Sequence, residues 1–125
     1  MKKIYYNKLV RDKIPERIEA SGGEYSIKKL NNRDYRKELI KKVGEESDGV
    51  VKAKDRKDII DELGDLLDVL DELRSNLKIK FTELSSSRKV AFIKKGGFKK
   101  RLFLVWSEDT GYKSNERKYD KKIKH

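Results

Sequence analysis

The chain has 125 residues, of which 35% are hydrophobic, and a formal net charge of +11. This length allows one modest hydrophobic core and is too short for two comfortable domains. Because the sequence contains no cysteine, disulfides, thiolate nucleophiles and cysteine-ligated metal centres are excluded, and any chemistry must rely on oxygen ligands.

No segment approaches the roughly 18 apolar residues that a membrane span needs. The first residues, Met1 to Asn7, also lack the apolar run of a signal peptide. We therefore expect a soluble, cytoplasmic protein without a membrane partner.

The charges are divided between an acidic middle and a basic end. Residues 44–72 contain 11 acidic and 4 basic side chains, whereas residues 86–125 contain 13 basic and 4 acidic ones. Clustered Lys and Arg can neutralise nucleic-acid phosphates, but the sequence has no recognisable recognition motif. We interpret the basic end as a solvated surface, with nucleic-acid binding as an unlikely alternative.

In chain order, the sequence first predicts a short helix over 15–20. Pro15 suits a first helical turn, and the glycines that follow Ser21 end the helix. A weak strand signal over 25–30 comes next, where apolar and polar residues alternate. Asn31 and Asn32 are then candidate caps for a long helix over 34–53.

Asp55 can cap a helix over 57–77, in which leucines and isoleucines recur at helical spacing. A further helix is predicted over 83–95, with Gly96 and Gly97 as its stop. Residues 101–106 form an apolar run rich in strand formers.

These elements predict a mostly α fold, an antiparallel bundle of about four helices. A short two-stranded pairing between 25–30 and 101–106 is an open addition to it. We expect one helical domain over 1–106 and a loosely ordered, basic and polar tail over 107–125.

Six acidic residues of the helix over 57–77 fall in one sector, opposite the leucines. Like charges at this spacing repel, and an external cation would offset the repulsion. The members of this sector are Asp58, Asp61, Glu62, Asp65, Asp68 and Glu72. A merely solvated face is the alternative.

Glu46 lies at the edge of the apolar stripe of the preceding helix, where a carboxylate is costly unless it is paired or bound to metal. A salt bridge to one of the many lysines would satisfy it. If the two helices form a hairpin through residues 54–56, Glu46 can instead face Glu62 and Asp65. Such converging carboxylates would suit Mg²⁺, or Mn²⁺ in its place.

Three stretches of the sequence, taken in order, resemble one known family. They are the lead-in from Tyr6 to Glu16, the acidic pattern formed by Glu45-Glu46 and by Glu62 to Leu67, and the Gly-Gly-Phe segment from Lys94 to Leu104. Together they resemble the MazG-like all-α nucleotide pyrophosphohydrolases, including small proteins labelled phosphoribosyl-ATP pyrophosphohydrolase-like.

The resemblance implies an all-α protein that works as a homodimer or higher oligomer. It also implies Mg²⁺-dependent hydrolysis of a nucleoside triphosphate, or a related nucleotide, between its α and β phosphorus atoms. Glu46, Glu62 and Asp65 match the family's metal-ligand positions. The fourth ligand would fall at position 49, where this chain has glycine.

Gly49 leaves several possibilities open. Asp48, one residue away, can reach the ion with Asp68 in support, or Glu45 and Asp48 can form the ligand pair in a shifted register. The third possibility is that the site is incomplete. Glu45 is our candidate general base for an attacking water. An incomplete site would make the chain a binding or scaffolding module that has lost hydrolysis.

Six basic residues are candidates to balance the charge of substrate phosphates. Three of them lie in the lead-in and three lie in the Gly-Gly-Phe segment. They are Lys8, Arg11, Lys13, Lys94, Lys95 and Arg101.

Overall fold

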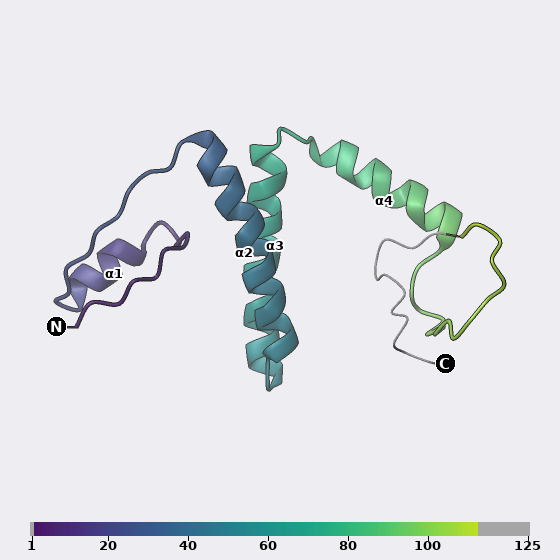
Figure 1. Cartoon of the computed structure of the whole chain (residues 1–125), viewed down its shortest axis with the longest axis horizontal. Coiled ribbons are helices and arrows are strands. Elements are labelled where there is room, and N and C mark those ends of the chain that lie inside the picture. The colour runs from purple at the N-terminus through teal and green to yellow at the C-terminus, as the bar shows by residue number, and fades with distance from the viewer. Residues whose placement is uncertain (1, 113–125) are drawn as a thin grey trace. The chain divides into compact units, whose positions relative to one another are not determined.

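The structure, a computed structural model, describes residues 2–112 and is mostly helical over that range. Its four helices are α1 (Ile14–Ala20), α2 (Asn32–Lys52), α3 (Arg56–Asn76) and α4 (Phe81–Lys95) (Figure 1). The predicted all-α class is thus confirmed, and the predicted helix boundaries differ from the observed ones by one or two residues. The chain divides into two compact units, Met1–Ser86 and Ser87–His125, which are described separately below.

The predicted β pairing is wrong, because neither 25–30 nor 101–106 is a strand in the part of the chain that the structure describes. Alternation over 25–30 suggested a half-buried face, yet the side chains of Tyr25 and Ile27 are 45% and 61% exposed. A strand gains stability from a paired neighbour and from a core that covers one of its faces. Trp106, in the second segment, is likewise exposed.

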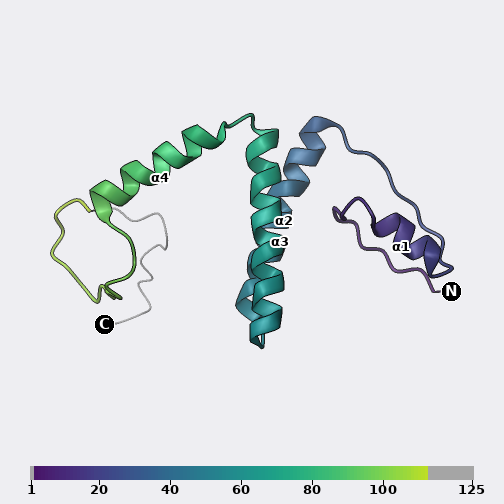
Figure 2. The same ribbon diagram turned by 180° about the vertical axis from the view of Figure 1, so that it is seen from behind.

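The central feature of the first unit is a pair of helices, α2 and α3, that lie side by side (Figure 1, Figure 2). Each helix begins at a side-chain cap. The Asn31 side chain accepts a hydrogen bond of 2.8 Å from the backbone N–H of Asp34, and Asp55 accepts one of 2.8 Å from that of Asp58. Such caps satisfy backbone donors that a first helical turn leaves free.

The two helices run antiparallel, because polar side chains join the beginning of α2 to the end of α3. Arg36 donates a hydrogen bond of 2.8 Å to the side chain of Asn76, and Asn76 donates one of 2.8 Å to Asn32. About one turn before Asn76 on α3, Glu72 accepts a hydrogen bond of 3.0 Å from the hydroxyl of Tyr35 on α2. The short connection between the helices lies at the opposite end of the pair.

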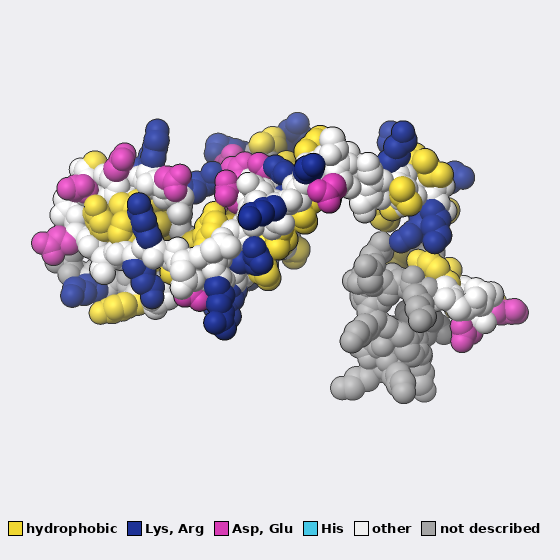
Figure 3. All heavy atoms as spheres, turned by 90° about the horizontal axis from the view of Figure 1, so that it is seen from above, with side chains coloured by type: hydrophobic (Ala, Val, Ile, Leu, Met, Phe, Trp, Pro, Cys, Tyr) yellow, Lys and Arg dark blue, Asp and Glu magenta, His cyan; other side chains and the backbone are white. Residues whose placement is uncertain are grey.

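The core of the helix pair is small. Leu39 of α2, at 3% exposure, is the only buried hydrophobic residue among those that the structure describes. One side of α3 presents apolar residues at three- and four-residue spacing, all at least 41% exposed: Ile60, Leu63, Leu67 and Leu70. Figure 3 shows apolar side chains open on the surface beside charged ones. A single copy of the chain therefore leaves much of its apolar surface in water.

In the second unit, a glycine pair ends α4 as the sequence predicts. Gly96 has a φ of 81°, a left-handed conformation that favours glycine, and its N–H donates a hydrogen bond of 2.8 Å to the carbonyl of Phe92. Residues 107–112 are exposed and lie outside the helices. The rest of the predicted tail, 113–125, lies outside the described residues.

None of the helices in residues 2–112 combines the length and the apolar composition that crossing a bilayer requires.

Candidate metal centre

The helix pair brings three carboxylates together. Glu46 comes from α2, Glu62 and Asp65 come from α3, and one oxygen of each lies within 4.8 Å of those of the other two. All three residues are partly exposed. Their convergence follows from the hairpin. Glu46 and Glu62 have the same sequence separation from Lys54 in the connection, so the antiparallel helices bring them to the same level.

The proximity of these acids changes the chemistry of Glu62. Desolvation is the largest cause that raises the pKa of its carboxyl above the ordinary value, and the nearby charges of Glu46 and Asp65 raise it further. The fold therefore disfavours the ionised form of the Glu62 carboxyl. A bound cation would relieve the repulsion.

Gly49 lies directly against this cluster. A Cβ atom built on Gly49 would overlap Oε2 of Glu62 and would stand 2.8 Å from its Cδ. The carboxylate of Glu62 therefore fills the space that a side chain at position 49 would enter. Any larger residue there requires the Glu62 side chain to rotate.

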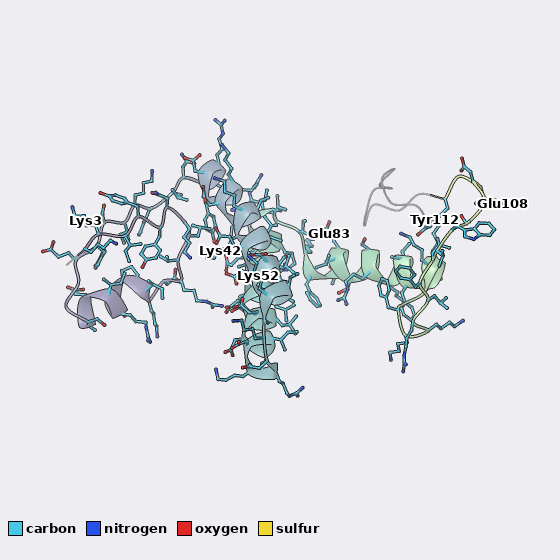
Figure 4. The ribbon with its side chains drawn as sticks, turned by 60° about the horizontal axis from the view of Figure 1, so that its bottom comes forward. Lys3, Lys42, Lys52, Glu83, Glu108 and Tyr112 are labelled. Atoms are coloured by element: carbon cyan, nitrogen blue, oxygen red, sulfur yellow. The ribbon has the colours of Figure 1, made fainter. Side chains whose placement is uncertain are left out.

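The other acidic candidates have cationic partners. Glu45 lies 3.3 Å from the ammonium of Lys42, and Asp48 lies 2.8 Å from that of Lys52, another residue of α2 (Figure 4). Among the described residues, Glu45, Asp48 and Asp68 are not members of the three-carboxylate cluster.

Lys42 is a neighbour of the cluster that the sequence analysis did not single out. Its ammonium lies 3.7 Å from the carboxylate of Glu46 and donates a hydrogen bond of 3.1 Å to the carbonyl of Leu9. The lysine pairing considered for Glu46 thus exists beside the carboxylate cluster. The spacing of Lys42, four residues before Glu46, was a signal for this contact.

Arg11 reaches the cluster from the lead-in segment. Its Nη2 lies 2.7 Å from Asp65 and 2.8 Å from Asp68, one turn apart on α3. These carboxylates, Asp68 first and then Asp65, raise the pKa of the guanidinium above its ordinary value. Of the six basic candidates for phosphate binding, Arg11 is the one paired with an acid of the cluster.

The other five basic candidates are divided between the lead-in segment and the second unit. The ammonium of Lys8 stands 5.8 Å from the ring centre of Tyr6, a cation–π distance, and Lys13 precedes α1 as its N-terminal flanking residue. Lys94 and Lys95 form the last turn of α4, and Arg101 follows in the second unit with a φ of 58°. These three are therefore not assigned to the carboxylate cluster.

The donors fit a hard divalent cation in type. Mg²⁺ takes oxygen ligands, is held by a few carboxylates and keeps several of its waters. Three partly exposed carboxylates meet that need, although position 49 offers no side chain and Arg11 already neutralises part of the charge.

Comparisons of the chain with protein-family models, with curated proteins and with solved structures find no match. The relation to the MazG-like family therefore stays a prediction that depends on the three sequence stretches alone.

Proposed function

We propose that the chain is a Mg²⁺-dependent nucleotide pyrophosphohydrolase, which releases pyrophosphate from a nucleoside triphosphate or a related nucleotide. The observation that carries the proposal is the convergence of Glu46, Glu62 and Asp65 from two helices. The sequence resemblance supplies the class of reaction. The same three residues are those that match the family's ligand positions.

In this proposal, Glu46, Glu62 and Asp65 hold Mg²⁺, or Mn²⁺ in its place. The bound ion supplies charge stabilisation for the phosphates and makes a water more acidic. The three carboxylates hold the ion at a fixed position, because they lie on two helices that each begin at a side-chain cap. Substrate phosphates then approach from the side of the lead-in segment, where Arg11 lies.

Glu45 is the proposed general base. It is next to Glu46 in α2, and its carboxylate is 44% exposed, so a water can reach it. The ammonium of Lys42 lies 3.3 Å from this carboxylate and orients it. The basic candidates outside the cluster, Lys8, Lys13, Lys94, Lys95 and Arg101, remain proposed phosphate contacts.

The alternative is a binding module that keeps the helical fold without hydrolysis. Gly49 favours it, since the cluster has three carboxylates and the space for a fourth is filled by Glu62. Fewer anionic ligands reduce the field that retains a second ion. Direct measurement of pyrophosphate release separates the two possibilities.

We also propose that the chain works as a homo-oligomer in the cytoplasm. The exposed apolar side of α3, formed by Ile60, Leu63, Leu67 and Leu70, supports a second copy as its partner. These residues follow the three- and four-residue spacing of a helix-packing seam. Because the sequence contains no cysteine, the fold needs no disulfide and is compatible with the reducing cytoplasm.

The experiment that tests the proposal is an assay of pyrophosphate release from a panel of nucleoside triphosphates with Mg²⁺. At least one nucleotide should be hydrolysed, and EDTA should abolish the reaction. Glu46→Gln, Glu62→Gln and Asp65→Asn should each lower kcat/KM by roughly a hundredfold or more, since charge stabilisation by such an ion is worth several kcal/mol.

Asp71→Asn is the matched control. Asp71 lies on α3, pairs with Arg74 at 2.9 Å and is outside the carboxylate cluster. Its loss should leave kcat/KM within about twofold, because a surface ion pair contributes little to stability. Absence of release from every nucleotide, with Mg²⁺ binding intact, would establish the binding module instead.

A further inference from the structure

The lead-in segment is attached to the helix pair at two points, both next to the carboxylate cluster. Lys42 of α2 holds the carbonyl of Leu9 at 3.1 Å, and Arg11 bridges Asp65 and Asp68 of α3 at 2.7 and 2.8 Å. Both attachments are cationic. The segment from Leu9 to Arg11 therefore crosses from one helix of the pair to the other beside the acids.

The two attachments differ in exposure. The Lys42 side chain is 18% exposed, whereas the Arg11 side chain is 60% exposed. An ion pair in water contributes little, because solvent and salt screen it and ordering a long side chain costs entropy. Arg11 is thus held weakly enough to be exchanged, while Lys42 keeps the segment near the helices.

Asp65 belongs both to the Arg11 contact and to the proposed ligand set. Because a carboxylate has two oxygens, Asp65 can contact the cation with one and Arg11 with the other. The cation, at about 2–3 Å from the carboxylate, and the guanidinium, at 2.7 Å, then repel each other. Occupation of the cluster by a cation must therefore weaken the Arg11 contact. By the same reciprocity, the Arg11 contact must weaken binding of the cation.

We propose that Arg11 is a displaceable counter-ion, which neutralises the carboxylate cluster in the empty protein and is released when a divalent cation binds. The segment from Leu9 to Arg11 then acts as a strap that is closed without the cation and open with it. After release, the guanidinium of Arg11 is unpaired beside the site. A guanidinium is suited to bidentate contact with a phosphate. This inference rests on the proposed function, since it assumes that the cluster binds a divalent cation.

The first test measures Mn²⁺ binding by electron paramagnetic resonance in wild type, Arg11→Ala and Arg11→Lys. Arg11→Ala should bind Mn²⁺ roughly three- to tenfold more tightly, the range expected when a competing exposed ion pair is removed. Arg11→Lys retains the charge without the fork geometry and should lie in between. Arg17→Ala, on α1, is the control for loss of one positive charge and should equal wild type.

The second test follows the mobility of a nitroxide spin label attached at Val10→Cys, a unique labelling site because the sequence contains no cysteine. With Mg²⁺, the label should become more mobile when Arg11 is released. In an Arg11→Ala background the label should be mobile without any metal, a result that does not depend on the proposed function. Unchanged mobility in that background would overturn the strap.

The outcomes separate the two proposals. If Mn²⁺ binds equally to wild type and to Arg11→Ala, the cluster is a metal site and the counter-ion role is overturned. If Arg11→Ala binds Mn²⁺ and wild type does not, the counter-ion role is supported in its strongest form. If neither binds, the proposed metal centre is overturned and the counter-ion proposal with it.

Discussion

Gly49 of α2 and Glu62 of α3 are complementary in shape, since the missing side chain of the glycine is the space in which the glutamate carboxylate lies. This relationship gives the glycine a structural role. It lets Glu62 approach α2 closely enough to join Glu46. An acid at position 49 and the observed position of Glu62 are therefore mutually exclusive, and a four-carboxylate site would require Glu62 to rotate.

Replacing Gly49 tests whether a fourth carboxylate completes the metal centre. Gly49→Glu adds a ligand but displaces Glu62, whereas Gly49→Ala causes the same displacement without adding a ligand. We expect the Glu variant to bind Mn²⁺ roughly tenfold more tightly than the Ala variant, because ligand charge sets affinity for such ions. Calorimetric titration of both variants measures the difference. Equal affinities would mean that position 49 cannot reach the ion.

The raised pKa of Glu62 predicts a pH-dependent stability. The ordinary value for this carboxyl is 4.5 and its pKa in the fold is higher, so the fold favours its protonated form. Its contribution to stability is therefore complete below the ordinary value and is lost as the pH rises through the raised pKa. Glu62→Gln should, without metal, be more stable than wild type near neutral pH and equally stable in acid.

Urea unfolding in EDTA at about pH 4 and at about pH 7.5 measures this difference. Mg²⁺ should reverse the order at the higher pH, since the ion stabilises only the chain that retains the carboxylate. A variant that is less stable than wild type at both pH values, without metal, would contradict the prediction.

Leu39 should contribute more to the stability of the helix pair than any exposed apolar residue. It is 3% exposed, and Leu39→Ala removes buried methyl groups and leaves a cavity in the core. The expected loss in the free energy of unfolding is roughly 2–5 kcal/mol. Val90→Ala, at a residue of α4 that is 64% exposed, is the control and should change it by less than about 0.5 kcal/mol. Urea denaturation measures both.

The apolar side of α3 predicts association between copies. Leu67 is 65% exposed in one copy, and a double change of Leu63 and Leu67 to Ser removes the centre of the exposed stripe. Wild type should elute as a dimer or larger in light scattering coupled to gel filtration, and the double variant as a monomer. A monomeric wild type over micromolar concentrations would contradict the proposal. Helicity measured by circular dichroism checks that the variant remains folded.

Local signals explain why the helices were predictable. Asn31 and Asp55 are cap residues of the expected type, and both accept the backbone hydrogen bond that defines a cap. Gly96 ends α4 in the left-handed conformation that a glycine stop implies. The strand prediction over 25–30 failed because an alternating pattern shows only that a segment suits a sheet. The segment has no neighbouring strand to pair with among the described residues.

The carboxylate cluster could be anticipated because hairpin geometry relates sequence spacing to spatial proximity. The contacts of the lead-in segment could not. Arg11 lies 54 residues from Asp65 and belongs to a segment without regular structure, so no periodicity relates the two. The carbonyl of Leu9 as partner of Lys42 was equally invisible, because every residue has such a carbonyl.

The connection from Ala53 to Asp55 reverses the chain direction and also sets which face of α3 meets α2. Because a helix turns by about 100° per residue, one residue inserted in the first turn of α3, directly after this connection, would rotate the rest of α3 by that angle. Glu62 and Asp65 would then leave Glu46, while the composition of the chain stayed almost unchanged. A deletion within the first turn of α3 would do the same in the opposite sense, so the number of helical residues before Glu62 sets whether it meets Glu46.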